Sequence, residues 1–279
     1  MPLLQLCWRR LVKPKTTLVV GCGNMGTSLL AGMLKSGVPA QTIHIVEPYP
    51  SEVVQSYAAL GCGLTATPPK PACAAGVVLL AIKPQMMEAA LSGLKAYIAQ
   101  ETILLSIAAG TSLKTLSDAF GGHRRCVRAM PNLPATISCG VTACYAHAEV
   151  GAVDRQVVND MFGTVGKLVW LEQEAELAAV TALSGSGPAY VFHMIECLEN
   201  AGINLGLSAE LARTLAVETI AGSSAMAKQS AEDATTLRQR VTSPGGTTEA
   251  ALDVLMPELG RLMRHTLEAA AKRARELAC

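Results

Sequence analysis

Short aliphatic runs alternate with longer amphipathic runs through the first part of the chain. The strand-like runs, rich in Val, Ile and Leu, cover residues 17–21, 42–47, 77–82, 102–107, 125–129, 140–146 and 167–171. This alternation is typical of an α/β fold with a parallel, doubly wound sheet. The runs at 77–81 and 103–107 are apolar on both faces, as strands covered by helices on both faces must be. We therefore expect these two at the centre of the sheet.

The pattern changes to helical spacing after residue 172, and no strand signal remains. Helices are predicted at 175–183, 188–201, 209–228, 234–241, 249–256 and 258–277. We therefore divide the 279 residues into an N-terminal extension (1–16), a sheet domain (17–172) and an all-α C-terminal domain (173–279). Small residues such as Ala212 and Ala216 repeat on one predicted helix. They favour close helix contact, either in an oligomer interface or in an intrachain core.

A glycine motif, Gly21-x-Gly23-x-x-Gly26, directly follows the first strand and opens the first helix. In this context the first glycine makes a tight turn, the second leaves room for a pyrophosphate, and the third lets helix and strand pack closely. Glu47 ends the second strand, where a carboxylate accepts hydrogen bonds from a ribose diol and repels a 2′-phosphate. No Arg or Lys follows at 48–52. The motif predicts a Rossmann-type domain that binds NADH or NADPH, with NADH favoured.

Three more turns follow strands at the same predicted edge of the sheet. Lys83 can counter a cofactor phosphate or hydrogen-bond a ribose, Pro84 ends its strand rigidly, and Asn132 offers a donor and an acceptor between two prolines. Each turn has an equally good interpretation as turn chemistry alone. The full predicted cofactor-binding set is Gly21, Gly23, Asn24, Met25, Gly26, Glu47, Ala81, Lys83, Pro84, Ala109 and Asn132.

Two segments of the helical domain combine several hydroxyls with several glycines. They are Ala182-Leu-Ser-Gly-Ser-Gly-Pro-Ala-Tyr190 and Val241-Thr-Ser-Pro-Gly-Gly-Thr-Thr248. Both open a predicted helix, and exposed backbone N–H groups at a helix start bind small anions such as a carboxylate. Helix capping is the alternative interpretation. Capping needs one hydroxyl, however, and these segments supply several.

Composition narrows the range of partners. The net charge is +1, divided into +5 for residues 1–172 and −4 for 173–279, and aromatic residues make up 4%. A negative half and few aromatic residues argue against a nucleic-acid surface, and the apolar runs are broken before they could span a membrane. The nine cysteines have no spacing that would bind a metal, and their odd number fits the reducing cytoplasm. The basic residues 1–16 are vaguely similar to a transit peptide, but a disordered extension or an upstream start codon is the preferred interpretation.

Taken together, the three turns and the two hydroxyl-rich segments resemble those of pyrroline-5-carboxylate reductase. The similarity extends from about residue 17 to the C-terminus. The most specific parts are 182–190 and 241–248, and one departure is Leu133, where the family usually has Thr. The resemblance implies NAD(P)H-dependent reduction of 1-pyrroline-5-carboxylate to L-proline, the last step of proline biosynthesis. It also implies a C-terminal dimerisation domain, a homodimer that often assembles further, and an active site between one subunit's cofactor and the other's segment 243–248.

The same resemblance implies roles for individual residues. Thr248 would hydrogen-bond the ring nitrogen, and Ser243 with the backbone of Gly245, Gly246 and Thr247 would bind the substrate carboxylate; Ser184 and Ser186 would complete the substrate site. Little acid–base machinery is needed, because an imine protonated on nitrogen already has an electrophilic carbon. None of the five histidines lies in a motif typical of a general acid.

Two other functions fit parts of the sequence. A β-hydroxyacid dehydrogenase shares the glycine motif and a helical second domain, but it uses a Lys on a helix of that domain, and residues 185–204 contain none. A non-catalytic dinucleotide sensor is the second alternative. A sensor has no need of a second anion pocket.

Overall fold

The computed structural model describes residues 16–68 and 75–278, which form two compact units. The first unit takes the residues up to Gly185 together with those from Ala271 onward, and the second takes Ser186–Ala270. The extension predicted for 1–16 lies outside the described residues except for Thr16. The compact units divide between Gly185 and Ser186. The domain boundary predicted after residue 172 stays a prediction.

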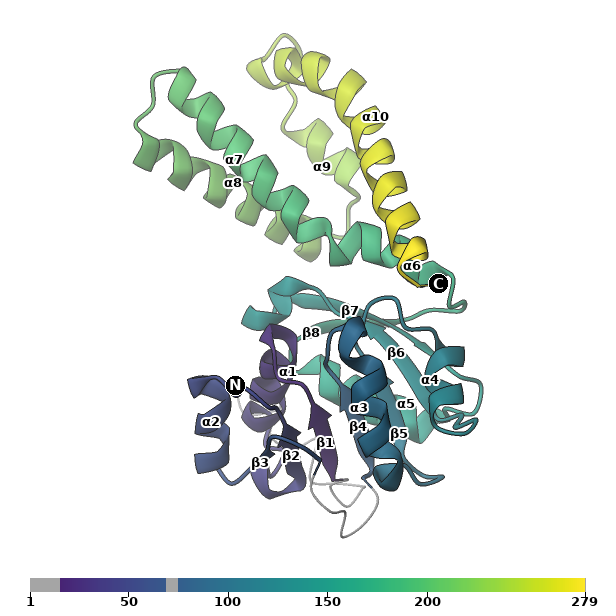
Figure 1. Ribbon diagram of the computed structural model, residues 1–279. Coiled ribbons are helices and arrows are strands. Elements are labelled where there is room, and N and C mark those ends of the chain that lie inside the picture. Colours follow the sequence, from purple (N-terminus) through teal and green to yellow (C-terminus); the bar gives the residue numbers. More distant parts are fainter. Residues whose placement is uncertain (1–15, 69–74, 279) are drawn as a thin grey trace. The chain divides into compact units, whose positions relative to one another are not determined.

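Eight strands form one sheet in the order β3-β2-β1-β4-β5-β6-β7-β8 (Figure 1). Their bounds are Thr17–Val20 (β1), Ile43–Val46 (β2), Gly63–Thr65 (β3), Val77–Leu80 (β4), Ile103–Ser106 (β5), Cys126–Met130 (β6), Gly140–Ala146 (β7) and Gly166–Trp170 (β8). The sequence predicted a parallel sheet, which is wrong for one pair: β7 is antiparallel to β6. Only the short helix η5 (Leu133–Ile137) joins these two strands, and a parallel return needs a longer crossover. The short edge strand β3 was not predicted.

Helices cover both faces of the sheet, which explains why its central strands have apolar residues on both faces. In β1, Val19 joins a core with α1 (Asn24–Lys35), α2 (Glu52–Ala59) and α5 (Ala152–Gly163), whereas Leu18 and Val20 join a second core with α3 (Met87–Leu94) and α4 (Leu113–Ala119). β4 and β5 alternate in the same way. Three 3-10 turns complete this part: η2 (Ala40–Thr42), η3 (Pro84–Met86) and η4 (Lys95–Tyr97).

The C-terminal part is helical, as predicted. Its elements are α6 (Glu176–Val180), the π-helical turn η6 (Thr181–Gly185), α7 (Gly187–Asn204), α8 (Ala209–Gln229), α9 (Ala234–Arg240) and α10 (Thr247–Glu276). The prediction of two helices at 249–256 and 258–277 is wrong, because α10 continues through Pro257. The proline removes one backbone hydrogen bond, but Ala, Leu, Glu and Arg, all strong helix formers, flank it.

The second unit has almost no core of its own. Helices α7 and α8 pack closely, since a Cβ added at Gly202 would lie 3.2 Å from the Cβ of Ala212. Within Ser186–Ala270, however, the buried residues are only Ala212 and Ala216. Large apolar side chains stay exposed on three helices, among them Phe192, Leu198, Leu211, Leu215, Met226, Val254 and Leu262. The close small-residue contact therefore does not enclose an intrachain core.

Candidate active site

The turns that follow β1, β4, β5 and β6 lie at one edge of the sheet, because these strands are mutually parallel. The predicted cofactor-binding residues fall in these turns or, for Glu47, directly after the parallel strand β2. The structure therefore brings the glycine turn to the same edge as Ala81, Lys83, Ala109 and Asn132. In doubly wound sheets this edge is the ligand-binding edge.

The three glycines of the motif meet three different steric demands. Gly21 has a φ of +85°, and an added Cβ would lie 2.6 Å from Ile82 Cγ2 and 2.7 Å from the Ala81 carbonyl oxygen. A Cβ at Gly26 would lie 2.8 Å from the carbonyl oxygen of Gly21. Gly23, in contrast, has no atom within 4 Å of the position of a Cβ. The turn is thus closed on the protein side and open at its middle glycine, which is the shape a pyrophosphate needs.

Helix α1 begins at this turn with free backbone donors. Gly23 is its N-cap, no side chain caps it, and its first turn contains no acidic residue. The first N–H with an acceptor is that of Thr27, which donates to the Gly23 carbonyl over 2.9 Å. Within the described part of the chain, the N–H groups of Asn24, Met25 and Gly26 have no hydrogen-bond acceptor. Three free donors at the positive end of a helix fit a phosphate group.

The carboxylate of Glu47 is bound to the glycine turn itself. Its Oε2 accepts a hydrogen bond from the backbone N–H of Cys22 over 2.8 Å, and its Oε1 accepts one from that of Tyr49 over 3.1 Å. Each carboxylate oxygen has two lone pairs, so both can still accept a second hydrogen bond. The structure therefore fixes a negative charge beside the turn, at the place where the sequence predicted a ribose contact.

The other residues of this edge have simpler surroundings. Asn132 Oδ1 accepts a hydrogen bond from the backbone N–H of Val141 over 2.9 Å, so its carboxamide also holds the start of β7. Lys83 and Ala109 are exposed, and Lys83 makes no ion pair with any described residue. The side chain of Pro84 lies outside the described residues, although its backbone begins η3.

One interaction at this edge was not predicted from the sequence. Glu174 Oε1 accepts a hydrogen bond from Arg128 Nη1 of β6 over 2.7 Å and another from the backbone N–H of Leu113 over 2.8 Å. It therefore holds the start of α4 and the middle of β6 together. The sequence feature that could have predicted an ion pair here is Arg128, which lies inside an otherwise apolar strand, because a charge in such a place requires a partner.

The first hydroxyl-rich segment, 182–190, forms a π-helical turn that leads into α7. Ser184 Oγ donates to the Val180 carbonyl over 3.0 Å, whereas the Ser186 side chain makes no capping bond. A Cβ added at Gly185 would lie 2.5 Å from Met130 Cε at the end of β6. Ser184 therefore lies near the cofactor edge, whereas Ser186 already belongs to the second unit. The sequence predicted a helix start here; π-helical turns often occur at functional sites.

The second segment, 241–248, forms a tight turn at the start of α10. Gly245 has a φ of +70°, and the Gly246 N–H donates to the Ser243 carbonyl over 3.0 Å. The first helical N–H with an acceptor is that of Ala250. Among the described residues, the N–H groups of residues 247–249 have no acceptor, and the hydroxyls of Ser243, Thr247 and Thr248 have no partner.

Four other helices of this chain have a side-chain N-cap. The side chains of Ser51, Ser112, Ser208 and Asp233 accept hydrogen bonds from the first turns of α2, α4, α8 and α9, respectively. Helix α10 receives no such bond from any of the three hydroxyls at its start. The hydroxyls of Ser243, Thr247 and Thr248 are therefore not used for capping and are available to a ligand, whereas the Thr242 hydroxyl donates to the Arg238 carbonyl.

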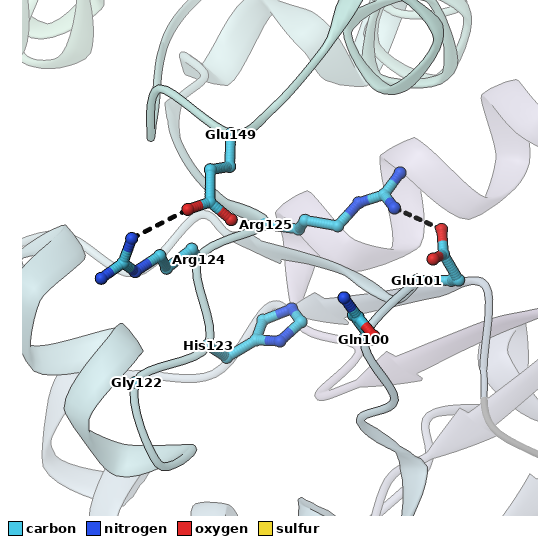
Figure 2. Close-up of a pocket in the computed structure, with 7 residues that line it drawn as sticks. All are labelled: Gln100, Glu101, Gly122, His123, Arg124, Arg125 and Glu149. Carbon is cyan, nitrogen blue, oxygen red and sulfur yellow. Dashed lines mark hydrogen bonds and ion pairs between the residues drawn. The ribbon is translucent and has the colours of Figure 1, made fainter.

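A pocket of about 430 Å³ lies at the opposite edge of the sheet, before β5 and β6. Its lining residues are Gln100, Glu101, Gly122, His123, Arg124, Arg125 and Glu149. Figure 2 shows Arg124 paired with Glu149 and Arg125 paired with Glu101. Arg125 also forms an ion pair with the buried Asp154, which the figure does not draw. Both arginines already have carboxylate partners, so this pocket does not suit a dinucleotide phosphate.

Three of the buried cysteines have thiols of low reactivity. Burial raises the pKa values of Cys22 and Cys62, and it raises that of Cys126 to about 12, so these thiols stay protonated at neutral pH. Within the described ranges, no group of three or more His, Cys, Asp or Glu side chains could hold a metal ion. No helix in the same ranges is long and apolar enough to cross a membrane.

Known proteins match both parts of the chain. The family model for pyrroline-5-carboxylate reductase dimerisation matches residues 174–277, and that for the coenzyme F420-dependent NADP oxidoreductases matches residues 16–110. The pyrroline-5-carboxylate reductase of Pseudomonas aeruginosa is 38% identical over 93% of this chain and 95% of its own length. That of Pisum sativum is 35% identical over 92% and 94%.

Solved structures agree with these sequence matches. The pyrroline-5-carboxylate reductase of Coxiella burnetii superposes with a TM-score of 0.89 at 32% identity, over 96% of this chain and 100% of that one. The Plasmodium falciparum enzyme, solved with NADP bound, gives 0.82 at 27% identity over 95% and 98%. The resemblance noted in the sequence is therefore confirmed, and the chain belongs to the pyrroline-5-carboxylate reductase family.

Proposed function

We propose that this protein reduces 1-pyrroline-5-carboxylate to L-proline with NADH or NADPH. One observation carries the proposal beyond family membership: the start of α10 presents three hydroxyls and three N–H groups that have no partner among the described residues. Such a group suits a small anion that also carries a polar ring atom. A cyclic imino acid has both features.

The residues of this chain would bind and orient the two reactants. The open glycine turn and the free N–H groups of α1 fit the pyrophosphate, and the bound nicotinamide supplies the hydride. Thr248 hydrogen-bonds the ring nitrogen, and Ser243 with the backbone N–H of Thr247 binds the carboxylate. The sequence also assigned the backbone of Gly245 and Gly246 to the carboxylate, but their N–H groups are bound to Glu249 and to the Ser243 carbonyl, respectively. Ser184 and Ser186 complete the substrate site. The protonated imine carbon is already electrophilic, so orientation and exclusion of water suffice.

The decisive experiment is an assay of the purified protein with 1-pyrroline-5-carboxylate and a reduced dinucleotide. We expect loss of the reduced-nicotinamide absorbance together with formation of L-proline. A β-hydroxyacid dehydrogenase would instead oxidise hydroxyacids, for which α7 carries no Lys. A dinucleotide sensor would bind the cofactor and leave it reduced.

We also infer a preference for NADH. The support is the carboxylate of Glu47, which is held 2.8 Å from the Cys22 nitrogen and would repel a 2′-phosphate, together with the absence of Arg and Lys at 48–52. The Plasmodium falciparum relative, in contrast, was solved with NADP. Comparing kcat/KM for the two cofactors tests the inference. A higher value with NADPH would contradict it.

The active form is proposed to be a homodimer of cytoplasmic location, with dimers that can assemble further. The support is the second unit, whose helices leave large apolar side chains exposed and whose sequence matches a dimerisation family. Apolar patches of this kind mark interfaces between protein subunits. In the dimer, segment 243–248 of one subunit would face the cofactor of the other.

A further inference from the structure

Glu249 has a contact in the substrate segment that its position in the sequence does not reveal. It is the third residue of α10, and its Oε2 accepts a hydrogen bond from the backbone N–H of Gly245 over 2.7 Å. Gly245 has the left-handed φ of +70° that reverses the chain before the helix. The carboxylate therefore closes the turn from the helix side; the N–H that it binds lies one residue before the one that a capping-box glutamate binds.

This contact divides the backbone donors of the segment into two groups. The N–H of Gly245 is bound to Glu249, and that of Gly246 is bound to the Ser243 carbonyl. The N–H groups of Thr247, Thr248 and Glu249 have no acceptor among the described residues. A substrate carboxylate would therefore meet the three helical N–H groups, while the turn that aims them is held internally.

Charge alone does not explain a glutamate at this position. Its carboxylate would repel a bound substrate carboxylate, although a negative charge in the first turn of a helix is itself favourable. A bond from a neutral N–H to an ionised acceptor is stronger than one between neutral groups. Glu249 therefore favours substrate binding by fixing the geometry of the turn, whereas its negative charge disfavours binding of the substrate carboxylate.

We propose that Glu249 is a positioning residue for substrate binding, which holds the turn of 243–246 so that the first N–H groups of α10 receive the substrate carboxylate. The proposal rests on the function proposed above. It predicts that substrate binding requires the hydrogen bond to Gly245 and does not require the negative charge.

Two substitutions separate these contributions. Glu249→Gln keeps an acceptor oxygen and removes the charge, whereas Glu249→Ala removes both. We expect Glu249→Ala to raise KM for 1-pyrroline-5-carboxylate about tenfold or more, the effect of losing a hydrogen bond to a charged group, with kcat and the cofactor KM nearly unchanged. Glu249→Gln should stay close to the wild type. Glu258→Ala, which removes another exposed carboxylate of α10, is the matched control.

Exchange of the Gly245 amide proton, followed by NMR, gives a readout that needs no turnover. It should be faster in Glu249→Ala and close to the wild type in Glu249→Gln. An unchanged or lowered KM in Glu249→Ala, or equal effects of Ala and Gln, would overturn the proposal. If the wild-type protein reduces no 1-pyrroline-5-carboxylate, the proposed function fails, and the exchange data still show whether Glu249 holds the turn.

Discussion

Phe162 and Phe192 show how differently the two units of this chain use apolar side chains. Phe162 of α5 is fully buried in the core on one face of the sheet, whereas Phe192 of α7 leaves 56% of its surface exposed. The first unit has two cores, each formed by one face of the sheet and its helices. The second unit buries only Ala212 and Ala216. The sheet unit can therefore fold from its own contacts, and the helical unit lacks contacts that a second copy would supply.

The two units also differ in how they present anion-binding groups. The glycine turn of the sheet unit is fixed by close backbone contacts around Gly21 and Gly26 and by the carboxylate of Glu47. In segment 241–248, the turn at 243–246 is held by the bond from the Gly245 N–H to Glu249 and by the bond from the Gly246 N–H to the Ser243 carbonyl. The proposed cofactor site is therefore built into a packed core, and the proposed substrate site depends on a few hydrogen bonds.

The largest expected effect comes from substituting the two phenylalanines. Phe162→Ala should lower the free energy of unfolding by about 3–5 kcal/mol, because it leaves a cavity in a fully packed core. This loss should not depend on protein concentration. Phe192→Ala should instead weaken self-association and make Tm more dependent on concentration. If Phe192→Ala destabilises the protein equally at all concentrations, the helical unit has a core of its own.

Blocking the glycine turn should abolish cofactor binding while leaving the fold intact. Gly23→Val places a side chain in the space proposed for the pyrophosphate, and no protein atom lies within 4 Å of the new Cβ. We expect affinity for NADH, followed by fluorescence titration, to fall at least about tenfold, or 1.4 kcal/mol. Gly151→Val is the matched control, because Gly151 is also an extended helix N-cap with open space around it. Normal NADH binding by Gly23→Val would place the phosphates elsewhere.

The sequence predicted those parts of the molecule that depend on local patterns. Hydrophobic periodicity predicted the central strands and the helical C-terminal part. The glycine motif predicted the place of Gly21. Strand β3 has only three residues at the sheet edge, too few for a pattern. The reversal of β7 depends on the length of a connection, and its run of apolar residues says nothing about direction.

The sequence did not predict which residues far apart in the chain contact each other. Glu174 binds groups that are 46 and 61 residues away, and nothing near it in the chain signals either partner. The contact from Glu249 to Gly245 is local, but Glu249 was predicted only as part of a helix. A single helical residue can point in several directions, and the bond depends on the left-handed conformation of Gly245.

Removing the Thr248 hydroxyl tests the substrate side alone. Thr248→Ala should leave NADH affinity unchanged and slow turnover, since loss of one hydrogen bond costs about 0.5–3 kcal/mol, the upper end applying to a charged partner. Thr248→Ser keeps the hydroxyl and should retain most of the activity. Comparing kcat for the three proteins at saturating NADH checks this. Equal turnover in the wild type and Thr248→Ala would remove Thr248 from the site.

Mixing two impaired variants tests whether the two units complete a site within one chain or across two copies. If the site is shared, a heterodimer of Gly23→Val and Thr248→Ala subunits has one site with both defects and one intact site. Random pairing makes half of the dimers heterodimers, so activity should return to about a quarter of the wild-type value in a symmetric dimer. The mixture is refolded together, and mass measurement confirms the heterodimers. Activity no higher than the average of the two variants would mean that each chain builds its own site from its own sheet and helical units.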